Sequence, residues 1–240
     1  MTRIHFFEHL EGHGAPQDLT RINLGKNILE ANEEVAHQVY HLYTDRGVFL
    51  TNVMGSPGSG KTTLIKALAQ HLKIAVLEGD IASSVDSIEF AKMNVPVVQV
   101  NTDIYGSACH LEAPWIADKL RLLIEYKPEF VFIENVGNLV CPSDFNLGEH
   151  ERLVVYSIPE GFDKPIKYPP MFTKATAVVL TKVDLAPVMD LDVEKFEESV
   201  RKINPHVQIF TFSAKDEKSI QPIVTYLEGK RQALLNNRSN

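Results

Sequence analysis

A glycine-rich stretch, GSPGSGKT (Gly55–Thr62), has the residue types and spacing of a loop that holds phosphate groups. It fits G-x-x-x-x-G-K-[ST] without a mismatch, follows an apolar run and opens a helical one. Its glycines let backbone N–H groups turn toward phosphate oxygens, and the helix N-terminus adds partial positive charge. Lys61 is expected to reach the β- and γ-phosphates, and the Thr62 hydroxyl to ligate Mg²⁺. The nucleotide contacts predicted here are Gly55, Ser56, Gly58, Ser59, Gly60, Lys61, Thr62 and Thr63.

Two short motifs farther along the chain indicate which base the nucleotide carries. TKVD (Thr181–Asp184) follows an apolar run and resembles the guanine-recognition motif [NT]-K-x-D. The Asp184 carboxylate could accept from guanine N1–H and from the N2 amino group, which adenine lacks at those places. The Lys182 stem would lie over the base. SAK (Ser213–Lys215) follows the next predicted strand, where the backbone N–H of Ala214 would meet guanine O6. We therefore predict GTP or GDP rather than adenine nucleotides.

Two acidic residues, Asp80 and Glu134, each end an apolar run that reads as a strand. Ligand sites in open α/β sheets lie at the carboxyl ends of strands, so both acids are expected to face the nucleotide, with a solvated loop carboxylate as the alternative. Gly137 would offer a backbone N–H to the γ-phosphate, and loss of that phosphate would release the loop. The predicted catalytic residues are Lys61, Asp80 and Glu134, and the predicted Mg²⁺ ligands are Thr62, Asp80 and Glu134.

The only two cysteines, Cys109 and Cys141, both follow predicted strands at the nucleotide end, and His110 is next to the first. A structural disulfide is not expected in a reducing compartment. A packing cysteine with a capping histidine is one interpretation, but neither cysteine lies inside an apolar run. Two thiolates and an imidazole suit Ni²⁺ or Zn²⁺. Three ligands from one chain leave a coordination sphere incomplete, and a symmetric dimer could complete it.

These residues can meet only if strands and helices alternate so that the strand ends share one edge. From Val48 onward the sequence shows this alternation, which predicts an α/β fold of the P-loop NTPase type with a doubly wound, mostly parallel sheet. The predicted strands are Val48–Met54, Lys73–Gly79, Val95–Asn101, Glu129–Glu134, Arg152–Ile158, Ala175–Lys182 and Val207–Ser213. The predicted helices are Lys61–Leu72, Ser84–Met93, Leu111–Tyr126, Leu191–Ile203 and Ser219–Leu235.

The N-terminal region divides into two parts. Residues 1–21 lack sustained periodicity and are expected to form a flexible arm; residues 22–240 form a single domain that begins with an amphipathic helix over Asn23–Tyr43. The arm carries His5, His9 and His13, for which a solvated role is favoured over weak metal binding. His37 and His41 share one helix face and could bind a metal, although a surface or packing role is favoured.

Composition and charge exclude several classes of protein. The chain has 240 residues and a formal net charge of −7, so its overall charge does not favour binding to nucleic acid or to an anionic membrane. No apolar run approaches the ~20 residues that a membrane span needs. Charged and polar residues interrupt the N-terminal stretch MTRIHFFEHLEGHGAP, which lacks a signal-peptide core. We expect a cytoplasmic protein.

The motifs GSPGSGKT, EGD, CHLEA, ENVGNLVCP, EGFDKPIKYP and TKVDL, in this order, resemble those of the HypB family over about Asn23 to Leu235. That family of GTPases, in the class of signal-recognition and MinD-like P-loop proteins, helps to insert nickel into [NiFe]-hydrogenase. The resemblance implies that Cys109, His110 and Cys141 are the Ni²⁺ or Zn²⁺ ligands. It also implies a homodimer on GTP binding, with metal at its interface, and a small nickel-binding maturation protein as partner. Lys164 would contact phosphate or the second subunit.

The sequence departs from the family in some places and leaves other functions open. It lacks the N-terminal cysteine motif and the long polyhistidine stretch of some members, and YGSA before Cys109 replaces an expected glycine-lysine-glycine run. Slow hydrolysis is expected without a partner, because the chain has no convincing arginine finger; Arg152 is a poor candidate, since it opens a strand. The alternatives are a passive metal-storage protein, a P-loop small-molecule kinase, and a GTPase chaperone for another metalloenzyme such as urease or a cobalamin enzyme.

Overall fold

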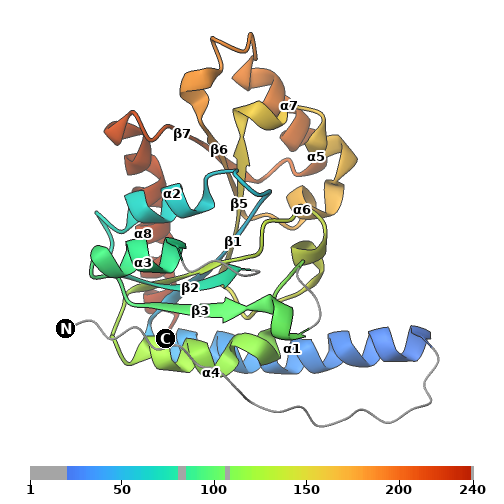
Figure 1. Cartoon of the computed structure of the whole chain (residues 1–240), viewed down its shortest axis with the longest axis vertical. Helices are drawn as coiled ribbons and strands as arrows, with labels where there is room; N and C mark the ends of the chain where they lie inside the picture. The colour runs from blue at the N-terminus through green and yellow to red at the C-terminus, as the bar shows by residue number, and fades with distance from the viewer. Residues whose placement is uncertain (1–20, 81–84, 106–108, 239–240) are drawn as a thin grey trace.

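The computed structural model describes residues 21–80, 85–105 and 109–238, so residues 1–20 of the predicted arm lie outside the described residues, and Arg21 already belongs to a helix. At its centre is a seven-stranded sheet, parallel throughout, with the strand order β3-β2-β4-β1-β5-β6-β7 (Figure 1). All seven predicted strands are confirmed, each within two residues at either end. The strands are β1 Phe49–Met54, β2 Ile74–Asp80, β3 Val97–Asn101, β4 Phe130–Glu134, β5 Glu151–Ser157, β6 Ala177–Thr181 and β7 Gln208–Phe212.

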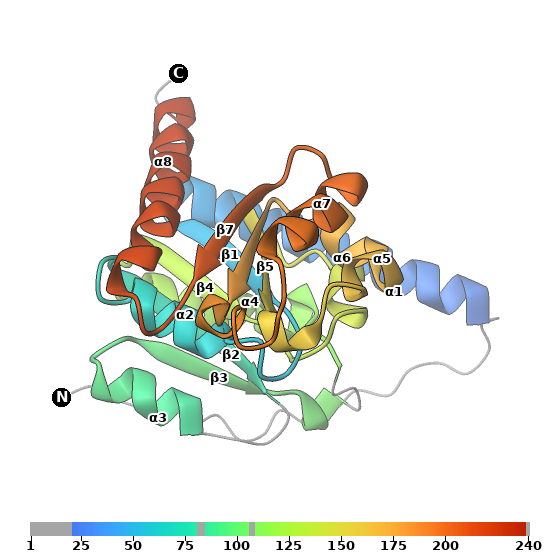
Figure 2. The ribbon, with the colours of Figure 1, turned by 90° about the horizontal axis from the view of Figure 1, so that it is seen from above.

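Helices connect the strands and cover both faces of the sheet, which confirms the doubly wound α/β prediction (Figure 2). The helices are α1 Arg21–Arg46, α2 Lys61–Leu68, α3 Val85–Lys92, α4 Ala113–Ile124, α5 Lys164–Lys167, α6 Pro169–Thr173, α7 Val193–Ile203 and α8 Gln221–Arg238. The short helices α5 and α6 were not predicted. The prolines of KPIKYPP lie in their first turns, where the missing N–H of proline removes no helical hydrogen bond.

The core has a layer on each face of the sheet. On one face α2, α3 and α8 pack on the strands through residues such as Leu64, Phe90 and Ile223. On the other, α1 and α4 cover β2 and β4, while α6 and α7 cover β5 and β6. Every residue of β1, β4 and β6 is buried, as a parallel sheet covered on both sides requires. Each fully buried Leu or Phe side chain contributes about 1.5–3 kcal/mol.

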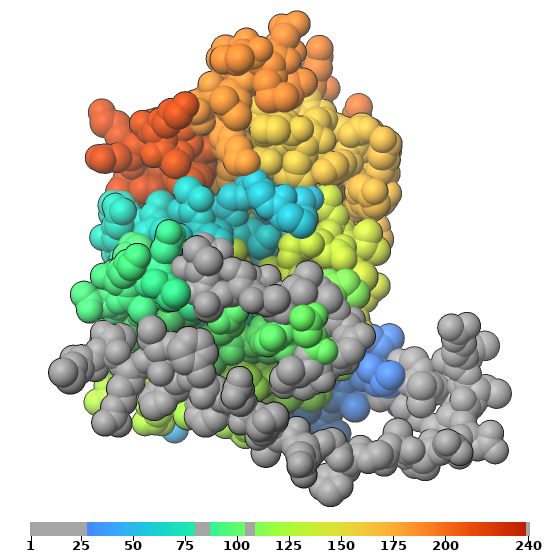
Figure 3. Space-filling view, viewed as in Figure 1, coloured from blue at the N-terminus to red at the C-terminus, as the bar shows by residue number. Residues whose placement is uncertain are grey.

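Helix α1 fulfils the amphipathic prediction in its second half. Val39 and Tyr43 are buried beside α4, and the Tyr43 hydroxyl donates to the Leu120 carbonyl over 3.0 Å. Burial raises the pKa of Tyr43. Nearer its start, Ile28 and Leu29 are more than two fifths exposed, because this end of α1 extends past the body of the molecule (Figures 1 and 2). In the space-filling view, blue residues of α1 emerge at the lower edge (Figure 3).

The strand order determines which loops meet at the carboxyl edge of the sheet. β4 lies between β1 and β2, with Val53 in register with Glu134 and Glu134 in register with Glu78. The loop that leaves β1 and the loop that leaves β4 therefore start side by side. In the part of the chain that the structure describes, no helix has the length and apolar character to cross a bilayer.

Candidate nucleotide and metal sites

The loop between β1 and α2 has the backbone of a phosphate cradle. Gly55, Gly58 and Gly60 all have positive φ values, of 152°, 71° and 96°. An added Cβ at Gly55 would collide with the carbonyl of Val155, so only glycine fits there. Gly60 caps α2, whose first N–H groups face the loop. The sequence motif therefore forms the loop-to-helix junction that anions favour.

Lys61, the first residue of α2, is folded onto this loop. Its side chain is only 7% exposed, and its ammonium donates to the carbonyls of Gly55 and Ser56, each over 3.2 Å. A lysine held this way needs only a small movement to reach a phosphate oxygen in the cradle. The position agrees with its predicted role as a phosphate contact.

Thr62 and Glu134 come from α2 and from the end of β4, and they meet. The Thr62 hydroxyl donates to Glu134 Oε1 over 2.7 Å, and Glu134 is 7% exposed. A hydroxyl and a carboxylate oxygen in contact beside a phosphate cradle are donors that suit Mg²⁺. Asp80 ends β2, as expected, but its side chain lies outside the described part of the structure.

Glu78 is a second buried acid that sequence reasoning missed. It lies on β2 in register with Glu134, is 3% exposed and accepts a hydrogen bond from Ser87 of α3. The motif EGD contained it, but only the pairing of β2 with β4 brings it to the pocket. Both acids line one pocket of about 560 Å³. The pocket is lined by Pro57, Gly58, Gly60, Lys61, Thr62, Thr63, Lys66, Glu78, Gly79, Glu134, Asn135, Val136, Gly137 and Lys182.

The two base-recognition motifs meet although they are separated in sequence. Asp184 Oδ1 accepts from the Ser213 hydroxyl over 2.8 Å, and Oδ2 pairs with the Lys215 ammonium at 2.9 Å. Lys215 and then Ser213 hold the pKa of Asp184 below its usual range, so the carboxylate is ionised. Lys182, at φ 58°, donates to the Gly58 carbonyl over 2.7 Å. Ala214, next to Ser213, is exposed at the same end.

Lys164 is a predicted site residue that lies apart from the phosphate pocket. It is the first residue of α5 and pairs with Glu160, with 3.1 Å between Nζ and Oε2. Lys167 pairs with Asp163 one turn along. In the described structure, neither lysine lines the phosphate pocket. A phosphate contact by Lys164 remains a prediction.

The segment after β4 is attached to the phosphate loop. Asn138 forms an antiparallel bridge with Gly55, and its N–H donates to the Gly55 carbonyl over 3.1 Å. An added Cβ at Gly137 would lie 2.9 Å from the ring of Pro57, so this glycine allows the close approach. The Asn138 side chain accepts from the Val140 N–H over 2.8 Å. One residue thus contacts both the phosphate loop and the backbone of Val140, the residue before Cys141.

The two cysteines and the histidine lie together. Cys109, His110 and Cys141 each offer a ligand atom, and these atoms all lie within 4.8 Å of one another. Cys109 Sγ is 3.3 Å from His110 Nδ1, and both cysteines are partly exposed and free of disulfide. Two thiols and an imidazole nitrogen are donors suited to Ni²⁺ or Zn²⁺. The described residues contain no other group of three or more candidate ligands.

The surroundings of the cluster orient His110. Its ring stacks on Phe145, with centroids 4.0 Å apart, and also faces Trp115. Its Nε2 lies 3.3 Å from a Glu112 carboxylate oxygen, as in metal sites where a carboxylate orients a ligating imidazole. Burial lowers the pKa of His110, but the hydrogen bonds with Glu112 and then Cys109 outweigh it, so the pKa is raised. A hydrogen bond that the Cys141 thiol donates to Cys109, and then burial, raise the pKa of Cys141.

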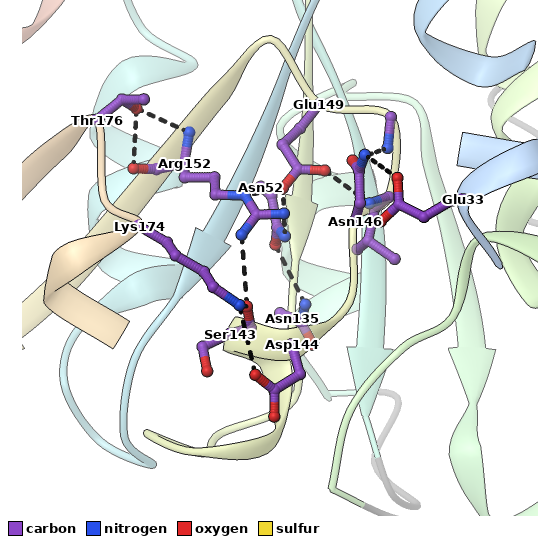
Figure 4. Close-up of polar contacts among 12 residues, drawn as sticks. Glu33, Asn52, Asn135, Ser143, Asp144, Asn146, Glu149, Arg152, Lys174 and Thr176 are labelled. Atoms are coloured by element: carbon purple, nitrogen blue, oxygen red, sulfur yellow. Dashed lines mark hydrogen bonds and ion pairs between the residues drawn. The ribbon is translucent and has the colours of Figure 1, made fainter. Parts of the chain in front are cut away.

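A buried polar network lies under the loop that carries Cys141 (Figure 4). Asn135, the residue after Glu134, donates to Asn52 Oδ1 over 3.1 Å, and Asn52 donates to Glu149 over 3.4 Å. Glu149 is also paired with Arg152, with 2.6 Å between Oε1 and Nε. Arg152 is therefore held beneath the loop by Glu149.

The same network fixes the turn that contains Cys141. The carbonyl of Ser143 accepts from Arg152 over 3.4 Å and from the Lys174 ammonium over 2.9 Å (Figure 4). Ser143 belongs to a short 3₁₀ turn, Cys141–Asp144. The turn is thus held by Arg152 of β5 and by Lys174 in the segment before β6. Its first residue, Cys141, places its thiol beside Cys109 and His110.

A phosphate loop, two buried acids and a guanine-type base motif at one edge of a parallel sheet define a P-loop nucleotide-binding protein. A family model described as "CobW/HypB/UreG, nucleotide-binding domain" matches residues 49–211. The chain therefore belongs to the CobW/HypB/UreG family, and its relatives named below are HypB proteins.

Several HypB proteins resemble the chain over most of its length. "Hydrogenase/urease maturation factor HypB" of Helicobacter pylori is 39% identical over 217 residues, covering 88% of each chain. "Hydrogenase maturation factor HypB" of Escherichia coli K12 is 40% identical, covering 86% of this chain and 72% of its own. The crystal structure of H. pylori HypB in complex with nickel has a TM-score of 0.80 at 40% identity, and covers 85% of this chain and 96% of that one.

Proposed function

We propose that the protein is a Mg²⁺-dependent GTPase that carries nickel and helps to insert it into a metalloenzyme, a [NiFe]-hydrogenase in the first place. The family, the nickel complex of the H. pylori relative and the names of the HypB proteins support this proposal. The H. pylori name also mentions urease, which makes urease a second candidate recipient. Zn²⁺ fits the same donor atoms.

The chain's own residues supply the parts that GTP hydrolysis needs. Lys61 would move from the loop carbonyls to the β- and γ-phosphates, and Asp184 would select guanine. Thr62 and Glu134 would hold Mg²⁺, which when bound neutralises charge on the phosphates. Glu78 and Asp80 add two carboxylates near the carboxyl end of β2, the strand that pairs with β4.

The observation that carries the proposal is the double contact of Asn138. Its backbone pairs with Gly55 in the phosphate loop, and its side chain accepts from the N–H of Val140, the residue before Cys141. A movement of the loop on γ-phosphate release would therefore move Cys141 relative to Cys109 and His110. Nucleotide state would set the strength of the metal site in this way, which a passive storage protein does not require.

Dimer formation completes the proposed site. Three protein ligands leave coordination positions open on Ni²⁺ or Zn²⁺, and both thiols are partly exposed. In a GTP-bound homodimer a second copy could provide further ligands at the same interface. We propose that a small nickel-binding maturation protein exchanges metal with this site in the cytoplasm.

Equilibrium dialysis against Ni²⁺ tests the metal site. Cys109→Ser and Cys141→Ser should each lower the affinity by about tenfold or more, since each removes a ligand. Cys141→Ser should also change GTP turnover, because its loop contacts the phosphate loop. A steady-state GTPase assay run in parallel should show guanine-specific turnover that disappears in Lys61→Ala. Unchanged nickel binding in both cysteine variants would contradict the site.

A further inference from the structure

Two histidines on the exposed surface of α1 lie outside both sites described above. His37 and His41 are one helical turn apart, and their Nε2 atoms are 3.1 Å apart. Their ring centroids are 4.3 Å apart, at 73° to each other. Histidines at positions i and i+4 of a helix present their nitrogens on one face, as in helices that hold Zn²⁺.

The distance between the two nitrogens matches that between neighbouring ligands on one metal ion. With metal–nitrogen bonds of about 2.0–2.1 Å, two donors at 90–109° lie about 2.9–3.4 Å apart. The observed 3.1 Å, which is a hydrogen bond between the two imidazoles, falls within this range, so an ion would replace the shared proton and the two rings need only turn their lone pairs toward it. The helix backbone already provides the alignment, which reduces the entropy lost on binding.

The surroundings favour a cation. His37 borders a hollow of about 710 Å³ between α1 and the loop before β5, with Glu33, Glu34 and Asn146 among its lining residues. Asn146 donates to Glu33 over 3.0 Å and holds that carboxylate against the loop. The negative charge of Glu33 and Glu34, one turn before His37, attracts a cation to the histidines.

We propose that His37 and His41 form a second metal site, which takes one divalent transition-metal ion such as Ni²⁺, Cu²⁺ or Zn²⁺. Imidazole nitrogens suit these ions, and water would occupy the remaining positions. The site offers two protein ligands without a thiolate, so it binds more weakly and exchanges more quickly than the cysteine cluster. The inference stands on the geometry of α1 and does not depend on the proposed function.

The test uses the full chain with Cys109→Ser and Cys141→Ser, so that the cysteine cluster no longer binds. Equilibrium dialysis should still detect binding of about one Ni²⁺ ion, and His37→Gln or His41→Gln should each lower its affinity by about tenfold or more. His206→Gln, an exposed histidine outside the pair, is the matched control and should leave the affinity unchanged.

A second measurement separates the pair from His5, His9 and His13 in the N-terminal arm. In histidine-labelled protein, substoichiometric Cu²⁺ should broaden the NMR signals of His37 and His41 first. A variant with Gln at the three arm positions should retain this broadening. The proposal is wrong if the residual Ni²⁺ affinity is unchanged in His37→Gln, or if binding is lost only in the arm variant.

Discussion

His150 gives the protein a stability that depends on pH. It immediately precedes β5 and stacks on Phe49, and its Nδ1 accepts a hydrogen bond from the Leu50 N–H over 2.9 Å. Its Nε2 lies 3.0 Å from the Thr44 hydroxyl. Burial lowers its pKa from 6.5 to about 4. Protonation of Nδ1 would also place an N–H of the ring against the N–H of Leu50, which now donates to it. The folded state therefore holds this imidazole neutral.

The sign and size of the effect follow from linkage. Between pH 6.5 and about 4 the unfolded chain takes up a proton at His150 that the folded chain does not, so stability falls as the pH falls through this window. A pKa shift of this size contributes about 3 kcal/mol to the free energy of unfolding when His150 is fully deprotonated, at roughly 1.4 kcal/mol per pKa unit. About 2 kcal/mol of it is lost between pH 7 and pH 5, and almost none above pH 7.

Urea unfolding of the metal-free protein at pH 7 and pH 5 measures this difference. His150→Asn keeps an acceptor for Leu50 but cannot be protonated, so it should lose about 2 kcal/mol less than the wild type over the same interval. His206→Asn, at an exposed position, should behave as the wild type. Equal losses in the wild type and His150→Asn would refute the assignment of a neutral, partly buried His150.

Three further predictions concern the nucleotide site. Asp184→Asn should move the preference from guanine toward xanthine nucleotides, because an amide donates where the carboxylate accepts; retained guanine preference in competition binding would contradict the base assignment. Glu134→Gln should lower GTP turnover by about a hundredfold and raise the Mg²⁺ concentration needed, and an unchanged Mg²⁺ dependence would remove it from the ligand set. Gly137→Ala should impair GTP turnover by pushing on Pro57, whereas Gly229→Ala, with open space around its Cβ, should leave turnover unchanged; equal turnover in the two variants would speak against the close approach.

The sequence was sufficient for features that depend on local pattern. The phosphate loop and its flanking strand and helix are contiguous, and short apolar runs and helical periodicity identify the other elements without reference to their neighbours. Ligand sites in open α/β sheets lie at the carboxyl ends of strands, and this rule predicted that Glu134 faces the nucleotide. In the structure Glu134 lies at that edge of the sheet, in contact with Thr62.

Features that depend on pairing between distant segments could not be obtained in this way. Glu78 reaches the pocket because β2 pairs with β4, and several strand orders were compatible with the same alternation. Phe145 stacks on His110 although 34 intervening residues separate them.

Coupling between nucleotide and metal is the central claim, and one measurement tests it most directly. The Ni²⁺ affinity of the full chain should be compared by equilibrium dialysis in the presence of GDP and of a non-hydrolysable GTP analogue. Because Asn138 pairs with Gly55 and also holds the backbone N–H of Val140, the residue before Cys141, we predict that the two affinities differ by about tenfold or more, and that the difference is lost in Cys141→Ser. Equal affinities in the two nucleotide states would contradict the account.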